Sequence, residues 1–296
     1  MHESSKTIFL LLFAAIMIAA GCGTDIPKTE RVPPAPQETA APSPRALYVL
    51  ADAGFTNLQL ENPTLPVYDR HTLAERRSRG LTTSLPEIRP YASGRIAYLT
   101  FDDGPDDVNT PAILDILKAE GVPATFYVVG RNVEAHPDIL KRIHDENHAI
   151  GNHSYSHDNA AVYASPEAFL AEMEQTDEII FQQIGMRPLI VRAPGGTASG
   201  QFTDAYWAPL AASGYAEHDW NVDPGDSAGS AVPAADLVAN AAGQLMQEHT
   251  QQTAIILLHC AAGHETTVEA LPEIIHLLKE QGFSFGVVTP MTPTLR

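Results

Sequence analysis

The feature that most constrains this fold is a regular alternation of short apolar runs with helical segments, which begins at Arg95. The apolar runs are residues 96–101, 124–129, 149–152, 189–191, 216–222, 255–258 and 283–288. The helical segments are residues 111–120, 137–147, 166–184, 233–248 and 268–281, and several of them open with proline at a first-turn position. This alternation predicts an α/β fold with a parallel sheet, either a closed barrel of seven units or an open doubly wound sheet.

Polar side chains that could react follow five of the seven runs, after Phe101, Asn152, Val191, Val222 and Leu258. In a barrel of parallel strands the carboxyl ends of the strands meet at one rim, where residues from different strands form the active site. The positions of these side chains therefore favour the barrel over the open sheet.

Two of these positions carry the strongest chemical signal. Asp102 and Asp103 lie at the end of the first run, and His153 and His157 follow the third. Two imidazoles four residues apart and one carboxylate provide three ligands for a divalent ion such as zinc, which leaves a coordination position open for water or substrate. Successive side chains of a strand point to opposite faces, so the second aspartate can join its neighbour only if the chain turns there. The glycine and proline that follow Asp103 predict such a turn.

Five short motifs connect the chain to a known family. They are Thr100-Phe101-Asp102-Asp103-Gly104-Pro105, His153-Ser154-Tyr155-Ser156-His157, Arg192-Ala193-Pro194-Gly195, residues 219–226 and Leu257-Leu258-His259. In this order they resemble the five motifs of the polysaccharide deacetylases, carbohydrate esterase family four. The likeness covers residues 95–288, and the first two motifs form a highly specific pair. The resemblance implies a distorted (β/α)7 barrel as a catalytic domain over residues 95–290.

The resemblance assigns the central chemistry residue by residue. It implies that Asp103, His153 and His157 bind a divalent metal, with zinc as the first choice and Co²⁺ or another divalent ion as alternatives. Asp102 would be the general base that deprotonates water for attack on an acetamide carbonyl, which the metal polarises. His259 would protonate the departing amine, because an imidazole with an ordinary pKa of about 6.5 can hold and release a proton near neutral pH.

The resemblance also implies residues that support the base and the acid. Arg192 would orient Asp102, since a guanidinium can hold a carboxylate through two parallel hydrogen bonds. Asp226 would keep His259 protonated, because a carboxylate beside an imidazole raises its pKa. Asp223 competes with Asp226 for this role, and the spacing does not decide between them.

The substrate groove is where the sequence departs from the family pattern. Family members usually have an aromatic residue in place of Gly195 and a tryptophan in place of Ser227. The resemblance assigns the backbone N–H of residue 195 to oxyanion binding, and a glycine still provides that donor. Leu257 and Trp220 are expected to bind substrate, although Trp220 could instead pack in the core. The departures predict retained chemistry with altered specificity.

The N-terminal residues predict export. Residues 1–22 contain a thirteen-residue apolar run, too short to span a bilayer comfortably, and end in a small-residue sequence before Cys22 that resembles a bacterial lipobox. Lipidation of Cys22 would make this a membrane-anchored lipoprotein at the bacterial envelope, with ordinary cleavage and secretion as the alternative. Cys260 would then be the one remaining thiol, so no intramolecular disulfide is expected. Residues 23–45 hold six prolines and predict an extended tether.

Residues 46–94 are an N-terminal extension for which the sequence suggests no function. A strand is expected at residues 46–50 and a short basic helix at residues 73–79.

Elsewhere, Cys260 is expected to be a small buried apolar residue. Four histidines, His218, His249, His264 and His276, are expected at the surface.

Charge and composition limit the partners. A formal net charge of −18 argues against nucleic acid and anionic lipid surfaces, and a hydrophobic content of 44% is ample for a core. Together with the family resemblance, these features predict a monomeric hydrolase that removes N-acetyl groups from an amino-sugar polymer, most simply peptidoglycan N-acetylglucosamine at the envelope. Chitin-type oligomers, exopolysaccharides and O-acetyl esters remain open as substrates. Two rivals are a glycosidase that uses Asp102 with Asp223 and a catalytically silent carbohydrate-binding relative.

Overall fold

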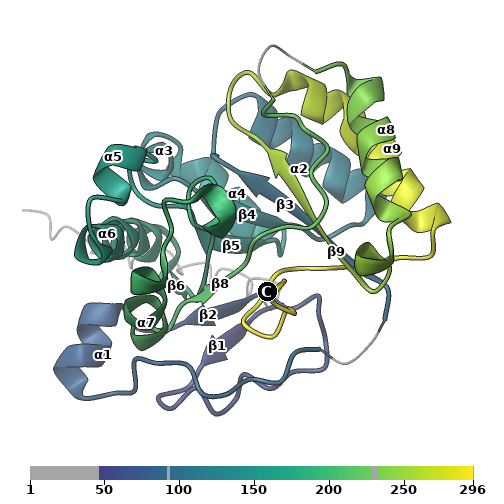
Figure 1. The fold of residues 1–296 in the computed structure, drawn as a ribbon. Helices are drawn as coiled ribbons and strands as arrows, with labels where there is room; N and C mark the ends of the chain where they lie inside the picture. The colour runs from purple at the N-terminus through teal and green to yellow at the C-terminus, as the bar shows by residue number, and fades with distance from the viewer. Residues whose placement is uncertain (1–46, 92–93, 229–231, 296) are drawn as a thin grey trace, which may run out of the picture. The chain divides into compact units, whose positions relative to one another are not determined.

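The seven predicted apolar runs form one parallel sheet in the computed structural model of the protein, which describes residues 47–91, 94–228 and 232–295 (Figure 1). Its strands are β3 (Ile96–Asp102), β4 (Thr125–Val128), β5 (Ala149–Asn152), β7 (Ile190–Val191), β8 (Ala216–Glu217), β9 (Thr253–His259) and β10 (Ser284–Gly286). A parallel bridge between Val222 and Ile256 joins the segment after β8 to β9, so the sheet curves back on itself as a distorted barrel. The predicted signal segment and tether lie outside the described residues.

The distortion is concentrated around the first strand of the barrel. In a regular seven-stranded barrel, the seventh strand, β10, would lie between the sixth strand, β9, and the first strand, β3. Here β9 pairs with the whole of β3, from Ile96↔Thr253 to Asp102↔His259. On the other edge of β3, β10 pairs with its first half and β4 with its second half. The carboxyl ends of β3 and β9 therefore lie side by side.

All five helices predicted for the barrel are present, together with short ones that the sequence did not predict. The helices after the extension are α2 (Asn109–Glu120), α3 (Gly130–Ala135), α4 (Pro137–Asp145), α5 (Asn159–Val162), α6 (Pro166–Ile184), α7 (Asp204–Ala212), α8 (Ala234–Leu245) and α9 (Glu265–Glu280), with single 3₁₀ turns at Thr197–Ser199 and Glu248–Thr250. Local signals explain the agreement at α6, because the Ser165 side chain accepts a hydrogen bond from Ala168 N–H and Gly185 ends the helix in the left-handed conformation. None of the helices in the described ranges combines the length and apolar character needed to cross a bilayer.

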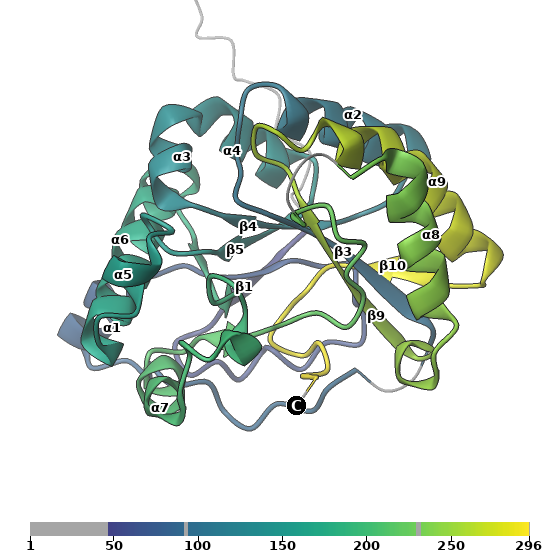
Figure 2. The ribbon, with the colours of Figure 1, turned by 45° about the horizontal axis from the view of Figure 1, so that its top comes forward.

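The strands separate an inner face from an outer face that is covered by helices (Figure 2). On β3, Ala97, Leu99 and Phe101 belong to the main apolar core, which also contains side chains of α2, α4, α6, α8 and α9. Tyr98 belongs instead to a smaller inner cluster with Tyr127 of β4. Since side chains alternate along a strand, Asp102 shares the inner face with Tyr98.

The N-terminal extension packs against the barrel. Its elements are β1 (Val49–Ala51), β2 (Val67–Asp69) and α1 (Leu73–Arg79), close to the predicted strand and identical to the predicted helix. A second sheet forms where β1 runs parallel to β2, and β2 runs antiparallel to β6 (Arg187–Pro188), which follows α6. An apolar cluster joins Ala51, Phe55, Leu58 and Val67 of the extension to Leu189 and Met291 of the barrel.

Candidate active site

The chain turns directly after β3, as the glycine and proline there predicted. Asp102 is the last residue of the strand, and Asp103 adopts a left-handed conformation with φ of 72°. The Asn132 side chain donates a hydrogen bond of 2.6 Å to the Asp103 carbonyl and holds this turn. A strand would point the two side chains to opposite faces, but the turn brings both carboxylates to one cavity.

That cavity lies at the carboxyl ends of the strands and has a volume of about 530 Å³. Its lining residues are Asp102, Asp103, His153, His157, Gly195, Trp220, Asp223, Asp226, Ser227, Leu257, His259, Ala262, Gly263 and His264. All the predicted site residues therefore line it except Arg192, whose side chain is fully buried behind Asp102.

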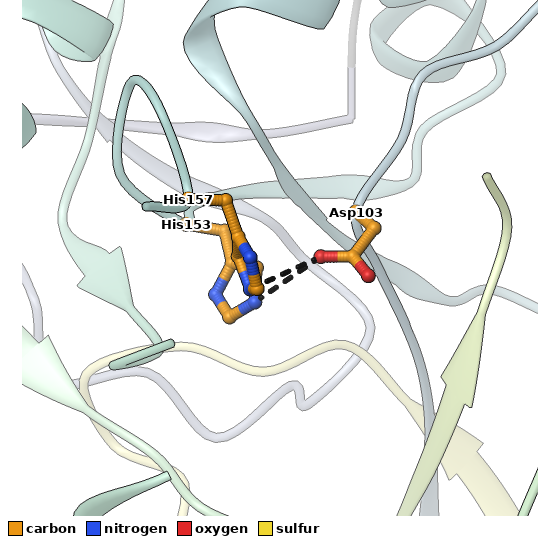
Figure 3. Close-up of side chains that lie close together, drawn as sticks. All are labelled: Asp103, His153 and His157. Carbon is orange, nitrogen blue, oxygen red and sulfur yellow. Dashed lines mark ion pairs between the residues drawn. The ribbon is translucent and has the colours of Figure 1, made fainter. Parts of the chain in front are cut away.

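Three of these side chains converge as metal ligands would (Figure 3). The Asp103 Oδ1 atom lies 3.3 Å from His157 Nε2 and 3.6 Å from His153 Nε2. Ligands about 2.0–2.2 Å from a tetrahedral zinc ion are separated by roughly 3.3–3.6 Å, so the atoms already have suitable spacing. Among the described residues, the buried Asp103 Oδ1 atom has no hydrogen-bond partner. The three residues fit a divalent ion.

The backbone holds His153 in a suitable ring orientation. Its Nδ1–H donates a hydrogen bond of 2.8 Å to the Arg192 carbonyl, which leaves the lone pair of Nε2 for an ion. Burial lowers the pKa of His153, against the opposing charges of Asp102 and Asp103. The neutral ring that results is the form that binds metal.

The turn between the two histidines depends on a residue that the sequence did not reveal. Ser154 and His157 both have positive φ, and the Ser154 hydroxyl accepts a hydrogen bond of 3.0 Å from the His157 N–H. Glu172 of α6 accepts hydrogen bonds from the N–H groups of Tyr155 and Ser156, at 3.0 and 2.7 Å. No local feature of the sequence links Glu172 to this turn, and only the tertiary structure shows the contact.

The candidate base is buried and bound to the predicted arginine. Asp102 is 2% exposed, and its Oδ1 atom accepts a hydrogen bond of 2.8 Å from Arg192 Nη1. This is a single hydrogen bond and not the parallel pair that a guanidinium can form, because Arg192 Nε donates to the His218 carbonyl at 2.9 Å. The Asp102 Oδ2 atom points toward the histidines, 3.7 Å from His153 Nε2. One oxygen of Asp102 therefore holds its orientation while the other faces the metal site.

The structure decides between the two candidate partners of His259. The Asp226 Oδ1 atom lies 2.8 Å from His259 Nδ1, and its Oδ2 accepts hydrogen bonds of 2.7 Å from the His259 N–H and the Thr267 hydroxyl. Asp223 instead accepts a hydrogen bond of 2.8 Å from the Gly225 N–H. Burial lowers the pKa of His259, but the hydrogen bond and charge of Asp226 outweigh burial and raise the pKa to about 9.

Two of the four histidines expected at the surface are in fact buried or line the cavity. His218 is 1% exposed, and His264 is stacked on His259 with ring centroids 5.0 Å apart. A second set of possible metal ligands lies in the same cavity. Its ligand atoms, from Asp226, His259 and His264, lie within 4.8 Å of one another. However, both oxygens of Asp226 already accept hydrogen bonds, whereas Asp103 Oδ1 accepts none from the described residues. The expectation of buried Cys260 and exposed His276 is confirmed.

Comparisons with known proteins agree with this site. A family model described as polysaccharide deacetylase matches residues 90–216. A peptidoglycan-N-acetylglucosamine deacetylase of Bacillus cereus is 37% identical over 207 residues, which are 69% of this chain and 70% of that protein. The chain belongs to the polysaccharide deacetylase family. The chain is also 32% identical to the putative polysaccharide deacetylase YheN of Bacillus subtilis, over 82% of this chain and 87% of YheN.

A solved structure supports the fold of this deacetylase. The carbohydrate esterase family four esterase of Streptococcus mutans superimposes with a TM-score of 0.61 at 32% identity, over 66% of this chain and 86% of that chain. The match confirms the predicted distorted barrel. Family membership also identifies the protein as a metal-dependent hydrolase that removes N-acetyl groups.

The groove wall of the deacetylase is formed in part by the residues that depart from the family pattern. Gly195 is exposed in the cavity wall with φ of 75°, and Ser227 lines the same cavity. The Trp220 ring lies against Gly196, where an added Cβ would be 2.7 Å from the ring. Trp220 also lines a second hollow of about 320 Å³ that adjoins Gly195. Trp220 therefore forms part of the wall and is not confined to the core.

Proposed function

We propose that this deacetylase acts on N-acetylglucosamine residues of peptidoglycan and uses zinc as its ion. The observation that carries the proposal is the Asp102 Oδ2 atom, which Arg192 does not bind and which lies beside the cluster of Asp103, His153 and His157. Relatives named as peptidoglycan-N-acetylglucosamine deacetylases support the choice of substrate. Two nitrogen ligands and one oxygen ligand support zinc.

The proposed reaction is hydrolysis of an acetamide to an amine and acetate. A divalent ion held by Asp103, His153 and His157 would supply Lewis acidity, which polarises the acetamide carbonyl and lowers the pKa of water. Asp102 removes the proton of the attacking water through the oxygen that Arg192 does not bind.

The remaining steps use other groups that line the cavity. The backbone N–H of Gly195 stabilises the negative charge that develops on the carbonyl oxygen. His259 donates its proton to the amine nitrogen as the C–N bond breaks, and Asp226 keeps the ring charged until then. Leu257 and Trp220 contact the sugar from the cavity wall.

An envelope location is part of the proposal. The support is the sequence before Cys22, which resembles a lipobox, and the proline-rich residues 23–45, which would span the distance from the membrane to the polymer. The expected mature protein carries acyl chains on Cys22 and partitions into the detergent phase. A mature protein without acyl mass that partitions into the aqueous phase would contradict the anchor and leave a secreted enzyme.

The test of the reaction is acetate release by the metal-free chain from residue 46 onward, with and without added zinc. We expect zinc-dependent acetate release from peptidoglycan fragments, at a higher rate than from chitin oligomers or O-acetylated xylan. Zinc-independent cleavage of the glycan chain without acetate would instead support a glycosidase. Folded, metal-bound protein that releases no acetate from any of these substrates would rule out the proposal.

A further inference from the structure

Four buried charged side chains connect the N-terminal extension to the barrel. They are Asp69 at the end of β2, Arg76 in α1, Arg187 in β6 and Asp177 in α6, and each is at most 2% exposed. Two are positive and two are negative, so the set is neutral as a whole. None of them lines the active-site cavity. Buried charges require compensation, so the removal of one affects the others.

Asp69 is the shared counter-ion of the two arginines. Arg76 donates to it through Nε and through Nη2, the second at 2.9 Å, and Arg187 donates through Nη2 at 3.0 Å. Arg187 Nη1 also lies 3.5 Å from Asp177 Oδ2. Without the charge of Asp69, Asp177 would be the one remaining carboxylate of the set for two buried guanidinium groups.

Asp177 already has another function in the native structure. Its Oδ1 atom accepts a hydrogen bond of 2.7 Å from the Asn152 side chain, and its Oδ2 accepts one of 2.7 Å from the Tyr215 hydroxyl. Asn152 in turn accepts a hydrogen bond of 3.0 Å from the Ser154 N–H. Asn152 directly precedes His153, so this bond holds the turn that carries both candidate metal-binding histidines.

We propose that Asp69, in the N-terminal extension, is a positioning residue for the metal site. By neutralising Arg187, it leaves Asp177 available to Asn152, which holds the turn from His153 to His157. The inference rests on the proposed metal site, and it gives the extension a function in catalysis that the sequence did not suggest. Asp69 itself touches neither the metal ligands nor the cavity.

The test is the dissociation constant for zinc, measured on the full chain by competition with a chromophoric chelator. We expect Asp69→Asn to weaken zinc binding about tenfold, the lower end of the effect of residues that orient metal ligands. The matched control is Arg77→Gln, because Arg77 joins the same helices, α1 and α6, through two 2.9 Å hydrogen bonds to Glu174 at a half-exposed site. Arg77→Gln should bind zinc as the wild type does.

A double-variant experiment distinguishes a loss of positioning at the metal site from a general destabilisation of the protein. If Asp69 acts through Asn152, Asp69→Asn should not weaken zinc binding further in a chain that already carries Asn152→Ala. Equal losses in both backgrounds, or a folded Asp69→Asn protein with wild-type affinity, would overturn the inference. A wild-type protein that binds no zinc would instead refute the proposed metal site.

A milder variant covers the case in which Asp69→Asn does not fold. Tyr215→Phe removes one hydroxyl from Asp177 without a change of charge, and we expect a smaller loss of zinc affinity in the same direction. Wild-type affinity in folded Tyr215→Phe would overturn the inference.

Discussion

The protonation of His259 depends mainly on one neighbouring carboxylate. Asp226 holds the pKa of His259 at about 9 in the folded protein, above the ordinary value of 6.5. The ring is therefore protonated at neutral pH, as the proposed proton donor must be, and it loses its proton as the pH rises through about 9. In Asp226→Asn, burial still lowers the pKa of His259, while the largest opposing contribution is gone and only the smaller ones of Asp102 and Asp103 remain. We expect the alkaline limb of the kcat/KM profile to move to lower pH, with roughly a 10²-fold loss of rate at pH 8.

The control for this experiment lies in the same cavity wall. Asp223→Asn removes the same charge near the site, but Asp223 makes its hydrogen bond to the Gly225 N–H and not to His259. With the same ion bound, its alkaline limb should stay within a few tenths of a pH unit of wild type. An unchanged profile in Asp226→Asn, or equal shifts in both variants, would reject the assignment of Asp226.

The adjacent aspartates are expected to have separable functions. Asp103→Ala should lose bound metal because it removes the oxygen that both histidines approach. Asp102→Asn should retain metal but lose about 10²–10⁴-fold in kcat, because the amide cannot accept the proton of water. Elemental analysis of the purified variants, beside acetate release, provides both measurements. Loss of metal in Asp102→Asn, or activity in metal-free Asp103→Ala, would contradict the division between ligand and base.

The residues that could be predicted are those whose chemistry is concentrated in one short segment. Asp102 and Asp103 are adjacent, and His153 and His157 share one turn, so their spacing is visible in the sequence. Glu172 holds that turn from a helix that begins nine residues after it. His264 follows an ordinary glycine-containing loop, and only the fold stacks it on His259. Neither residue has a local signal of its contact.

At the scale of elements, the amphipathic period of the sequence predicted the helices α2, α4, α6, α8 and α9. The bounds of α6 agree with the prediction because Ser165 and Gly185 determine both ends. α7 was missed, since it contains Pro209 and its apolar residues are not confined to one face. The pairing of β10 beside the first half of β3 also has no local signal, because strand order depends on contacts distant in sequence.

Close packing between β4 and β5 gives a prediction at this scale. A Cβ added to Gly151 would lie 2.4 Å from the ring of Tyr127, which is fully buried. We expect Gly151→Ala to lower the free energy of unfolding by about 1–3 kcal/mol, as overpacking does in well-packed cores. Urea unfolding followed by circular dichroism would measure this change.

The matched control is another glycine in a regular element. Gly243 lies in α8, and among the described residues no heavy atom outside its own stretch of helix backbone lies within 4 Å of an added Cβ. Gly243→Ala should therefore raise the free energy of unfolding by about 0.5–1 kcal/mol, because alanine loses less conformational entropy in a helix. Equal stability of the two variants would show that the strand tolerates the extra methyl group.

At the scale of the whole molecule, the extension and the barrel share buried surface. Leu189 and Met291 of the barrel are at most 1% exposed and pack in a cluster that the extension completes. The Tyr68 hydroxyl of β2 accepts a hydrogen bond of 3.1 Å from the Ile150 N–H of β5. The family resemblance begins near residue 95, so it did not predict this interface.

Removal of the extension should therefore destabilise the barrel. A chain that starts at residue 95 exposes Leu189 and Met291, at a cost of about 3–6 kcal/mol if each side chain contributes about 1.5–3 kcal/mol. Domains are typically stable by about 5–15 kcal/mol, so the shortened chain should retain little stability. Against a chain that starts at residue 47, we expect the midpoint of thermal unfolding to fall by about 10 °C or more. Equal midpoints for the two chains would mean that the barrel is stable without the extension, because the cluster around Leu189 would then contribute nothing measurable to its folding.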